Sequence, residues 1–167
     1  MIVIGIDPGT ALTGFGIVEE TANGHLTAIQ YGAIETSAEQ TLDKRLQIIY
    51  QALSKILILH RPQTGAVEKL FFQRNVRTAM SVGQARGVAM LALAEAGVEV
   101  AEYTPMQVKQ AVTGYGSADK NQVQQMVRAI LSLETAPQPD DVADALAVAI
   151  CHINSNRWEK MIQANKG

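Results

Sequence analysis

Hydrophobic residues near the start of the chain follow the pattern of short β-strands. Three apolar, β-branched runs occupy residues 2–7, 13–20 and 25–35, and short links join them. Pro8-Gly9 stops the first run, and Asn23-Gly24 between the second and third is typical of a hairpin turn. We therefore expect an antiparallel meander of three strands at the start of the fold.

The pattern then changes to a helical one. Leucine and isoleucine recur at intervals of three and four residues from Leu42 to Leu57, and Arg61-Pro62 follows as a stop signal. Ser37 and Gln40 have the spacing of a capping box, so we expect them to begin this helix.

Helices and strands alternate along the rest of the chain. Residues 65–70 and 98–103 are short apolar runs that predict strands, and a long helical pattern over 76–96 separates them, with Gly97 placed as its terminating glycine. Three more helices are expected, the first from Pro105, the second capped by Ser117 and reaching about Leu133, and the third from Asp140.

This order of elements predicts an α/β protein with a mixed five-stranded sheet, its antiparallel meander first and helices on both faces. The chain has 167 residues and no repeat or linker pattern, so we expect one domain over 1–154. Residues 155–167 are polar, and we expect them to form a frayed tail.

Composition narrows the class of protein. Hydrophobic residues make up 47% of the chain, but no apolar run is long enough to cross a membrane and the N-terminus lacks the pattern of a signal peptide. The single cysteine, Cys151, cannot form an internal disulfide. These features favour a cytoplasmic protein without membrane contact.

The net charge of −2 is not typical of a nucleic-acid-binding protein, but its distribution is uneven. Basic residues outnumber acidic ones between residues 69 and 128, while acidic residues prevail on either side. The middle of the chain could contact an anionic polymer, although an ordinary solvated surface explains these counts equally well.

Two carboxylates stand at the ends of predicted strands. Asp7 ends the first run, and Glu68 lies near the end of the strand over 65–70. Asp before Pro-Gly is common in turns, and a charge at a strand end is often simply solvated. Because open α/β sheets place their sites at the carboxyl ends of strands, the two acids could instead share one site.

Asp141 and Asp144 are three residues apart on the last predicted helix, so they share one face of it. Small and apolar residues dominate the rest of that helix, which indicates close packing against the sheet. Stabilisation of the helix N-terminus explains Asp140 and Asp141 but accounts less well for Asp144.

Together these four acids form a set of hard oxygen ligands, which suits Mg²⁺ or Mn²⁺ rather than zinc. Two such ions about 4 Å apart are a known arrangement for phosphodiester cleavage. His152 lies about 16 Å beyond Asp141 along the helix, too far to join the site, and we expect it at the helix C-terminus.

Several segments, in order, resemble the RuvC family of Holliday-junction resolvases. They are "IGIDPGTALTGFGIV", "AVEKLFF", "SVGQARGVAM", "QVKQAVTGYGSADKNQV" and "DDVADALAVAI", and the last two are the most specific. The resemblance implies a ribonuclease H-like fold and a crossover junction endodeoxyribonuclease. Such an enzyme would act in homologous recombination and DNA repair, nicking four-way DNA junctions in symmetric pairs through hydrolysis with two Mg²⁺ ions per subunit, for which Mn²⁺ would substitute. It also implies a homodimer and the branch-migration proteins RuvA and RuvB as partners.

Carried over by position, the resemblance makes Asp7, Glu68, Asp141 and Asp144 the metal-binding and catalytic acids. It places Lys109 and Lys120 near the scissile phosphate and makes Phe71 an aromatic residue that contacts bases. Phe72 could face either the core or DNA. Arg74, Arg77 and Arg86 could contact phosphates, although ordinary surface positions explain them equally well.

Three other functions remain open at this point. The first motif is also similar to the phosphate-binding hairpin of the actin, Hsp70 and sugar-kinase superfamily, but the chain is too short for the two domains of such proteins. A module that binds branched DNA without cutting it has no need of four acids. A related nuclease that acts on structured RNA is the third alternative.

The helix over 76–96 carries Gly83 and Gly87 among several alanines. Small residues permit close approach, either to the sheet or to a second subunit. A two-fold dimer would fit the cutting of two symmetric strands.

Overall fold

The computed structural model describes residues 1–69 and 76–164, except for the side chains of residues 76–78 and 160. Its five strands are β1 (Ile2–Asp7), β2 (Leu12–Glu20), β3 (Leu26–Glu35), β4 (Thr64–Glu68) and β5 (Glu99–Tyr103). Its helices are α1 (Leu42–His60), α2 (Val76–Glu95), α3 (Pro105–Thr113), α4 (Lys120–Ile130) and α5 (Asp140–Ala164).

The strands form one sheet in the order β3-β2-β1-β4-β5. The pairs β1/β2 and β2/β3 are antiparallel, whereas β1/β4 and β4/β5 are parallel. This confirms the mixed five-stranded sheet with the meander first. Because β1, β4 and β5 run in the same direction, their carboxyl ends meet at one edge of the sheet.

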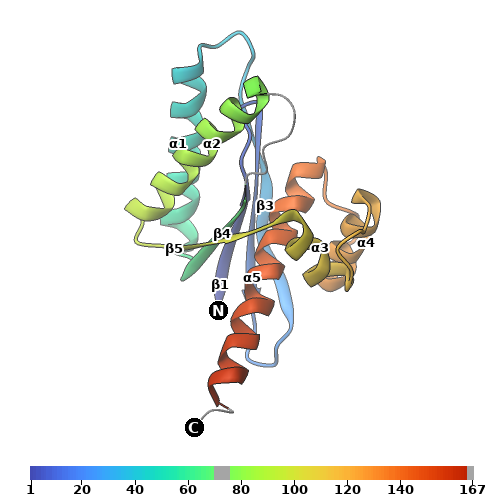
Figure 1. Cartoon of the computed structure of the whole chain (residues 1–167). Coiled ribbons are helices and arrows are strands. Elements are labelled where there is room, and N and C mark those ends of the chain that lie inside the picture. The colour runs from blue at the N-terminus through green and yellow to red at the C-terminus, as the bar shows by residue number, and fades with distance from the viewer. Residues whose placement is uncertain (70–75, 165–167) are drawn as a thin grey trace.

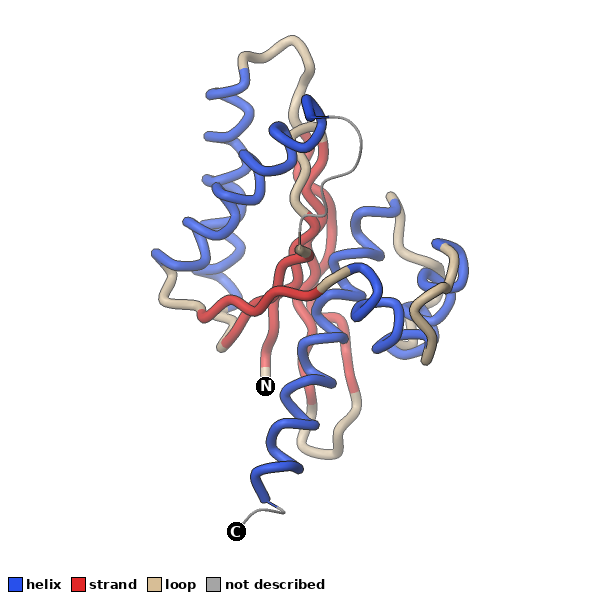
Figure 2. Tube along the Cα trace, viewed as in Figure 1, coloured by secondary structure: helices blue, strands red, loops and turns tan. Residues whose placement is uncertain are grey.

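Helices cover both faces of the sheet, with α1 and α2 on one side and α3, α4 and α5 on the other (Figures 1 and 2). Side chains along β1 point alternately to the two faces of the sheet and so enter the hydrophobic core on each face. Val3 packs in the cluster that contains α5, while Ile4 and Ile6 pack in the cluster that contains α1 and α2. The expected α/β class with helices on both faces is therefore confirmed.

Backbone contact between α5 and the sheet depends on glycine. A Cβ atom built on Gly5 would lie 2.1 Å from the carbonyl oxygen of Ala145, and one built on Gly14 would lie 2.0 Å from that of Asp141. Both distances are shorter than van der Waals contact, so neither position has room for a side chain. The N-terminal half of α5 therefore lies directly on β1 and β2.

Two predicted helix starts were wrong. Ser37 and Gln40 do bond to each other, the Ser37 amide donating to the Gln40 side chain, but they form an isolated turn, and α1 begins after Thr41. Likewise Asp119, rather than Ser117, caps α4 and forms a capping box with Gln122. Asp119 is as good a capping residue as serine, whereas the side chain of Thr41 makes no capping hydrogen bond to α1.

The expected frayed tail after Asn154 was also wrong as far as Ala164, because α5 continues that far. Arg157 holds this part of the helix to the meander: its guanidinium donates to Glu20 Oε1 at 2.5 Å and to the carbonyl oxygen of Gly24 at 2.6 Å. Residues 165–167 lie outside the described part of the chain.

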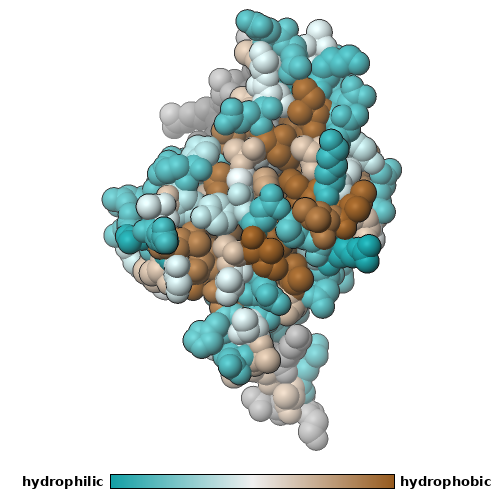
Figure 3. Space-filling view, turned by 180° about the vertical axis from the view of Figure 1, so that it is seen from behind, coloured by the Kyte–Doolittle hydropathy of each residue, from teal (hydrophilic) through white to brown (hydrophobic). Residues whose placement is uncertain are grey.

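The helices also leave apolar side chains at the surface. Ile58 and Leu59 near the end of α1 are 71% and 72% exposed, and Met80 and Leu91 on α2 are 63% and 52% exposed. Seen from behind, the molecule shows apolar side chains in patches separated by polar ones (Figure 3). Among the described residues, no helix has the length and hydrophobicity needed to span a membrane.

Candidate active site

Asp7 and Glu68 leave the sheet side by side. The parallel pairing of β1 with β4 joins Ile6 to Val67, and each acid is the next residue of its strand. β1 ends there because Pro8-Gly9 turns the chain after Asp7, and Glu68 is the last residue of β4. The two carboxylates predicted at strand ends therefore come to the same edge of the sheet.

The pair on α5 arrives at the same place. Gly14 is the β2 partner of Asp7, and the backbone of Asp141 lies directly over Gly14. Asp144 follows one turn later on the same helix and faces a cavity that Glu68 also lines. We call Asp7, Glu68, Asp141 and Asp144 the four-carboxylate site.

The cavity beside these acids has a volume of about 280 Å³. Glu68 and Asp144 line it together with Lys109 from α3 and Lys120 from α4, while Pro105, Val108 and Val123 form its apolar wall. Both lysines carried over from the family resemblance thus lie beside two of the acids. A pocket with two anionic and two cationic side chains can hold a phosphate group next to a cation.

Burial and mutual repulsion perturb the acids. Burial, followed by repulsion from the other carboxylates, raises the pKa of Asp7 to about 8. Burial and the charge of Asp144 raise the pKa of Glu68 to about 7, although Lys109 and Lys120 oppose this rise. The pKa of Asp144 is raised as well, chiefly by burial. Such clustered, strongly perturbed acids are typical of functional sites.

The donor set fits a divalent cation of the Mg²⁺ type, since every candidate ligand is a carboxylate oxygen. Across residues 1–69 and 76–164, however, no three Asp, Glu, His or Cys side chains stand at the spacing of a formed metal site. The repulsion that raises the pKa values gives a physical reason for this difference, because like charges drive the side chains apart unless a cation neutralises them. The acids thus share one location, while the described side chains do not adopt the coordination geometry of a bound cation.

Lys120 also approaches Asp140, with its Nζ 3.7 Å from Oδ2, in an exposed ion pair. The side-chain amide of Gln124 donates to the other oxygen of Asp140 at 2.6 Å. Asp140 thus ties α4 to the start of α5, a role that sequence reasoning missed by assigning Asp140 to the helix dipole. Its partners lie 16 and 20 positions away, where no local pattern connects them.

Several predicted DNA-contacting residues are not tested. Phe71, Phe72 and Arg74 lie outside the described residues, and Arg77 belongs to α2 but its side chain is not described. Arg86, which was an alternative phosphate contact, forms a salt bridge with Glu102 on β5 at 2.6 Å and is largely buried. It serves instead to hold α2 against β5.

His152 lies inside α5 and not at its C-terminus as expected, because the helix continues for three more turns. It is 5% exposed and hydrogen-bonds to side chains of β4 and β5. The prediction that His152 is not a ligand of the metal does not depend on where the helix ends, and it stays a prediction.

Comparison with known proteins gives a consistent picture. Residues 3–152 match the family model described as crossover junction endodeoxyribonuclease RuvC. The protein of that name from Heliobacterium modesticaldum is 58% identical over 158 residues, covering 95% of this chain and 97% of its own length. The one from Clostridioides difficile is 53% identical over 163 residues, covering 98% and 96%.

Solved structures agree with this match. RuvC from Thermus thermophilus in complex with a Holliday junction substrate superposes with a TM-score of 0.90 at 40% identity, covering 95% of this chain and 96% of that one. The yeast mitochondrial Holliday junction resolvase Ydc2 has a TM-score of 0.62 at 12% identity, covering 89% and 77%, and shares the fold.

Proposed function

Because this chain belongs to the RuvC family of crossover junction endodeoxyribonucleases, we propose that it resolves Holliday junctions by hydrolysis at the four-carboxylate site. One observation carries the assignment of the site: acids from β1, β4 and α5 meet at one edge of the sheet, next to two lysines. The actin-like alternative loses its basis, because the match to the resolvase family extends over nearly the whole chain.

The family is one of metal-dependent nucleases, and we infer that two Mg²⁺ ions per subunit, or Mn²⁺ in their place, are held by Asp7, Glu68, Asp141 and Asp144. When bound, such ions activate a water molecule for attack on the phosphodiester and stabilise the leaving oxygen. The chain orients these ligands by placing them on the ends of two strands and on one helix. The apolar wall of the cavity restricts water around the phosphate.

Lys109 and Lys120 would bind the scissile phosphate and stabilise the charge that develops on it. We expect Lys109→Ala and Lys120→Ala each to slow cleavage by about 10²-fold, the usual range for losing one such contact. Junction affinity should fall by much less, because many other phosphate contacts remain. Single-turnover cleavage and binding without divalent metal, measured on the same junction, separate the two effects. Equal losses in both measurements would contradict this role.

Contacts to junction DNA outside the cavity are assigned to Phe71, Phe72, Arg74 and Arg77. An exposed aromatic ring can stack on an unpaired base, and arginines can hold phosphates. This assignment rests on the family resemblance and on the excess of positive charge between residues 69 and 128.

A homodimer would bring two sites to two symmetric strands of the junction. The exposed face of α2 supports this proposal, since Met80, Gly87 and Leu91 lie on one side of the helix. Apart from the adjacent backbone of α2 itself, no heavy atom of the described residues lies within 4 Å of a Cβ built on Gly87. A hydrogen bond between Ser81 on α2 and Thr10 also connects this helix to the turn after Asp7.

Leu91→Asp is expected to dissociate the dimer, because it places a charge at the centre of a buried apolar contact. Leu59→Asp is the matched control, since Leu59 is even more exposed but lies on α1. Sedimentation equilibrium should give a monomer for the first variant and a dimer for the second. The reverse result would move the interface to α1.

We also propose that the protein works alongside RuvA and RuvB, which the family alone implies, and that it does so in the cytoplasm, which the composition favours. We also propose that residues 1–154 form the nuclease domain, which leaves the second half of α5 as an extension of it.

The decisive experiment compares three substrates in Mg²⁺: a synthetic immobile four-way junction, a linear duplex of equal length and an RNA hairpin. We expect cleavage of the junction alone, in paired nicks on opposite strands. Binding without cleavage would favour a binding module, and preferred cleavage of the hairpin would favour an RNA-processing enzyme.

A further inference from the structure

His152 joins three elements of the fold through one buried ring. Its Nε2 lies 2.9 Å from Thr64 Oγ1 at the start of β4, and its Nδ1 lies 2.8 Å from the hydroxyl of Tyr103 at the end of β5. Asn156, one turn further along α5, is 3.3 Å from Nε2. Burial lowers the pKa of the imidazole, so the ring is neutral near pH 7, with one nitrogen donating and the other accepting.

Tyr103 connects this ring to the four-carboxylate site. It is the register partner of Glu68 in the parallel pair of β4 and β5, and its carbonyl oxygen accepts a hydrogen bond of 2.7 Å from the amide of Lys69. The backbone of Tyr103 therefore lies beside Glu68 and is bonded to the residue that follows it. A shift of Tyr103 would move the carboxylate relative to its neighbours.

Tyr103 also precedes the helix that carries Lys109. Thr104 caps α3 through a capping box with Gln107, and Pro105 opens the helix, so α3 begins directly at the strand end. One side of α3 lines the active-site cavity through Val108 and Lys109. The position of Tyr103 thus sets where α3 starts.

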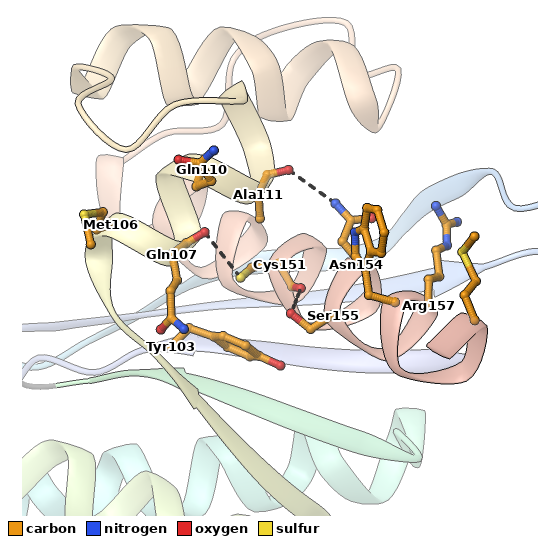
Figure 4. Close-up of a pocket in the computed structure, with 11 residues that line it drawn as sticks. Tyr103, Met106, Gln107, Gln110, Ala111, Cys151, Asn154, Ser155 and Arg157 are labelled. Carbon is orange, nitrogen blue, oxygen red and sulfur yellow. Dashed lines mark hydrogen bonds between the residues drawn. The ribbon is translucent and has the colours of Figure 1, made fainter. Parts of the chain in front are cut away.

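The other side of α3 is attached to α5 on either side of His152. Cys151 Sγ is 3.7 Å from the carbonyl oxygen of Gln107, and the side-chain amide of Asn154 donates to the carbonyl oxygen of Ala111 at 3.3 Å. The Tyr103 side chain lies along the same stretch of α5 (Figure 4). Residues 151–154 of α5 therefore form the support for both β5 and α3.

We propose that His152 is a positioning residue for DNA cleavage, holding Tyr103 so that Glu68 and Lys109 keep their places around the scissile phosphate. The inference rests on the proposed function of the four-carboxylate site. His152 touches neither substrate nor metal in this role. It acts through the Tyr103 hydroxyl, and its bond to Thr64 serves the packing of α5 on β4.

The test separates the two nitrogens of the ring. In His152→Asn the amide occupies the place of Nδ1 and can still bond to Tyr103, whereas in His152→Gln it occupies the place of Nε2 and reaches only Thr64. We expect single-turnover cleavage of a four-way junction in Mg²⁺ to be about tenfold slower for His152→Gln and within about threefold of wild type for His152→Asn, since small misplacements reduce rate steeply. Junction affinity without metal should be unchanged in both.

Tyr103→Phe and Thr64→Val are the matched partners, each removing a single hydroxyl. Tyr103→Phe should be slowed as much as His152→Gln, and the double variant should be no slower than either, because both remove the same bond. Thr64→Val should lower the melting temperature but cleave within about twofold of wild type. Cleavage rates that simply follow melting temperature across the four single variants would overturn the positioning role.

Failure of the His152 proposal can be told apart from failure of the proposed function. If the wild-type protein does not cut the junction, the site assignment fails. If it does cut and His152→Gln cuts equally fast, only the role of His152 is wrong.

Discussion

Asp7→Asn is expected to abolish junction cleavage while leaving junction binding intact. The substitution conserves size, but an amide cannot give up a proton to become a charged ligand for a cation, as Asp7 can. Asp7 is also the most deeply placed of the acids and the one that all three other carboxylates repel. Its effect should exceed the roughly 10–100-fold loss that follows from changing a group merely bonded to a metal ligand. Binding depends on basic side chains elsewhere, which the substitution does not touch.

The measurement compares cleavage rate in Mg²⁺ with junction affinity in the absence of divalent metal. Asp43→Asn is the matched control, because Asp43 is an exposed acid in the first turn of α1, on the opposite face of the sheet. It should cleave at the wild-type rate. Cleavage by Asp7→Asn at that same rate would refute the assignment of the four-carboxylate site.

Divalent-metal affinity should rise steeply with pH between about 6 and 8. Asp7, with a pKa of about 8, and Glu68, with a pKa of about 7, hold protons in this range, and a cation must displace them. Each displaced proton adds up to about tenfold in affinity per pH unit. Calorimetric titration with Mg²⁺ in buffers of different ionisation enthalpy counts these protons. An affinity that is constant from pH 6 to 8 would contradict the perturbed acids.

The same shift predicts how stability without metal depends on pH. The pKa of Asp7 is higher in the folded state than its ordinary value of 3.8, so the folded chain binds more protons between these values. Stability should therefore fall as pH rises from about 4 to 8, and added Mg²⁺ should restore it at the upper end. Asp7→Asn should weaken this dependence, and thermal melts at pH 5 and pH 8 would show the difference.

The fold and the four acids could be predicted because their signals are local. An apolar β-branched run that ends in an acid before Pro-Gly fixes the place of Asp7, and a spacing of three residues on an alanine-rich helix puts Asp141 and Asp144 on one face. The meeting of Asp7 and Glu68 at one edge needed only the parallel order of β1 and β4. The pair on α5 reaches that edge because the helix lies directly on Gly5 and Gly14. The lysines had no such signal, and only the family resemblance selected Lys109 and Lys120.

The features that were missed from the sequence are side-chain contacts between residues far apart in the chain. The second half of α5 is polar enough to suggest fraying, but Arg157 bonds to Glu20, 137 positions away. His152 was expected at a helix end because the helix was predicted to stop near Asn154. Its buried role could not be seen because its partners, Thr64 and Tyr103, lie 88 and 49 positions away. Contacts of this kind follow from the completed fold and leave no periodic trace along the chain.

Because of the glycines beneath α5, a change in the aliphatic residues around this helix need not change its distance from the sheet. At Gly5 and Gly14 the strands touch the helix through main-chain atoms, whose dimensions are the same in every sequence. The height of Asp141 and Asp144 above the sheet is thus independent of the size of the aliphatic residues around them. Those residues can change, and melting temperature with them, while the spacing required for chemistry stays constant.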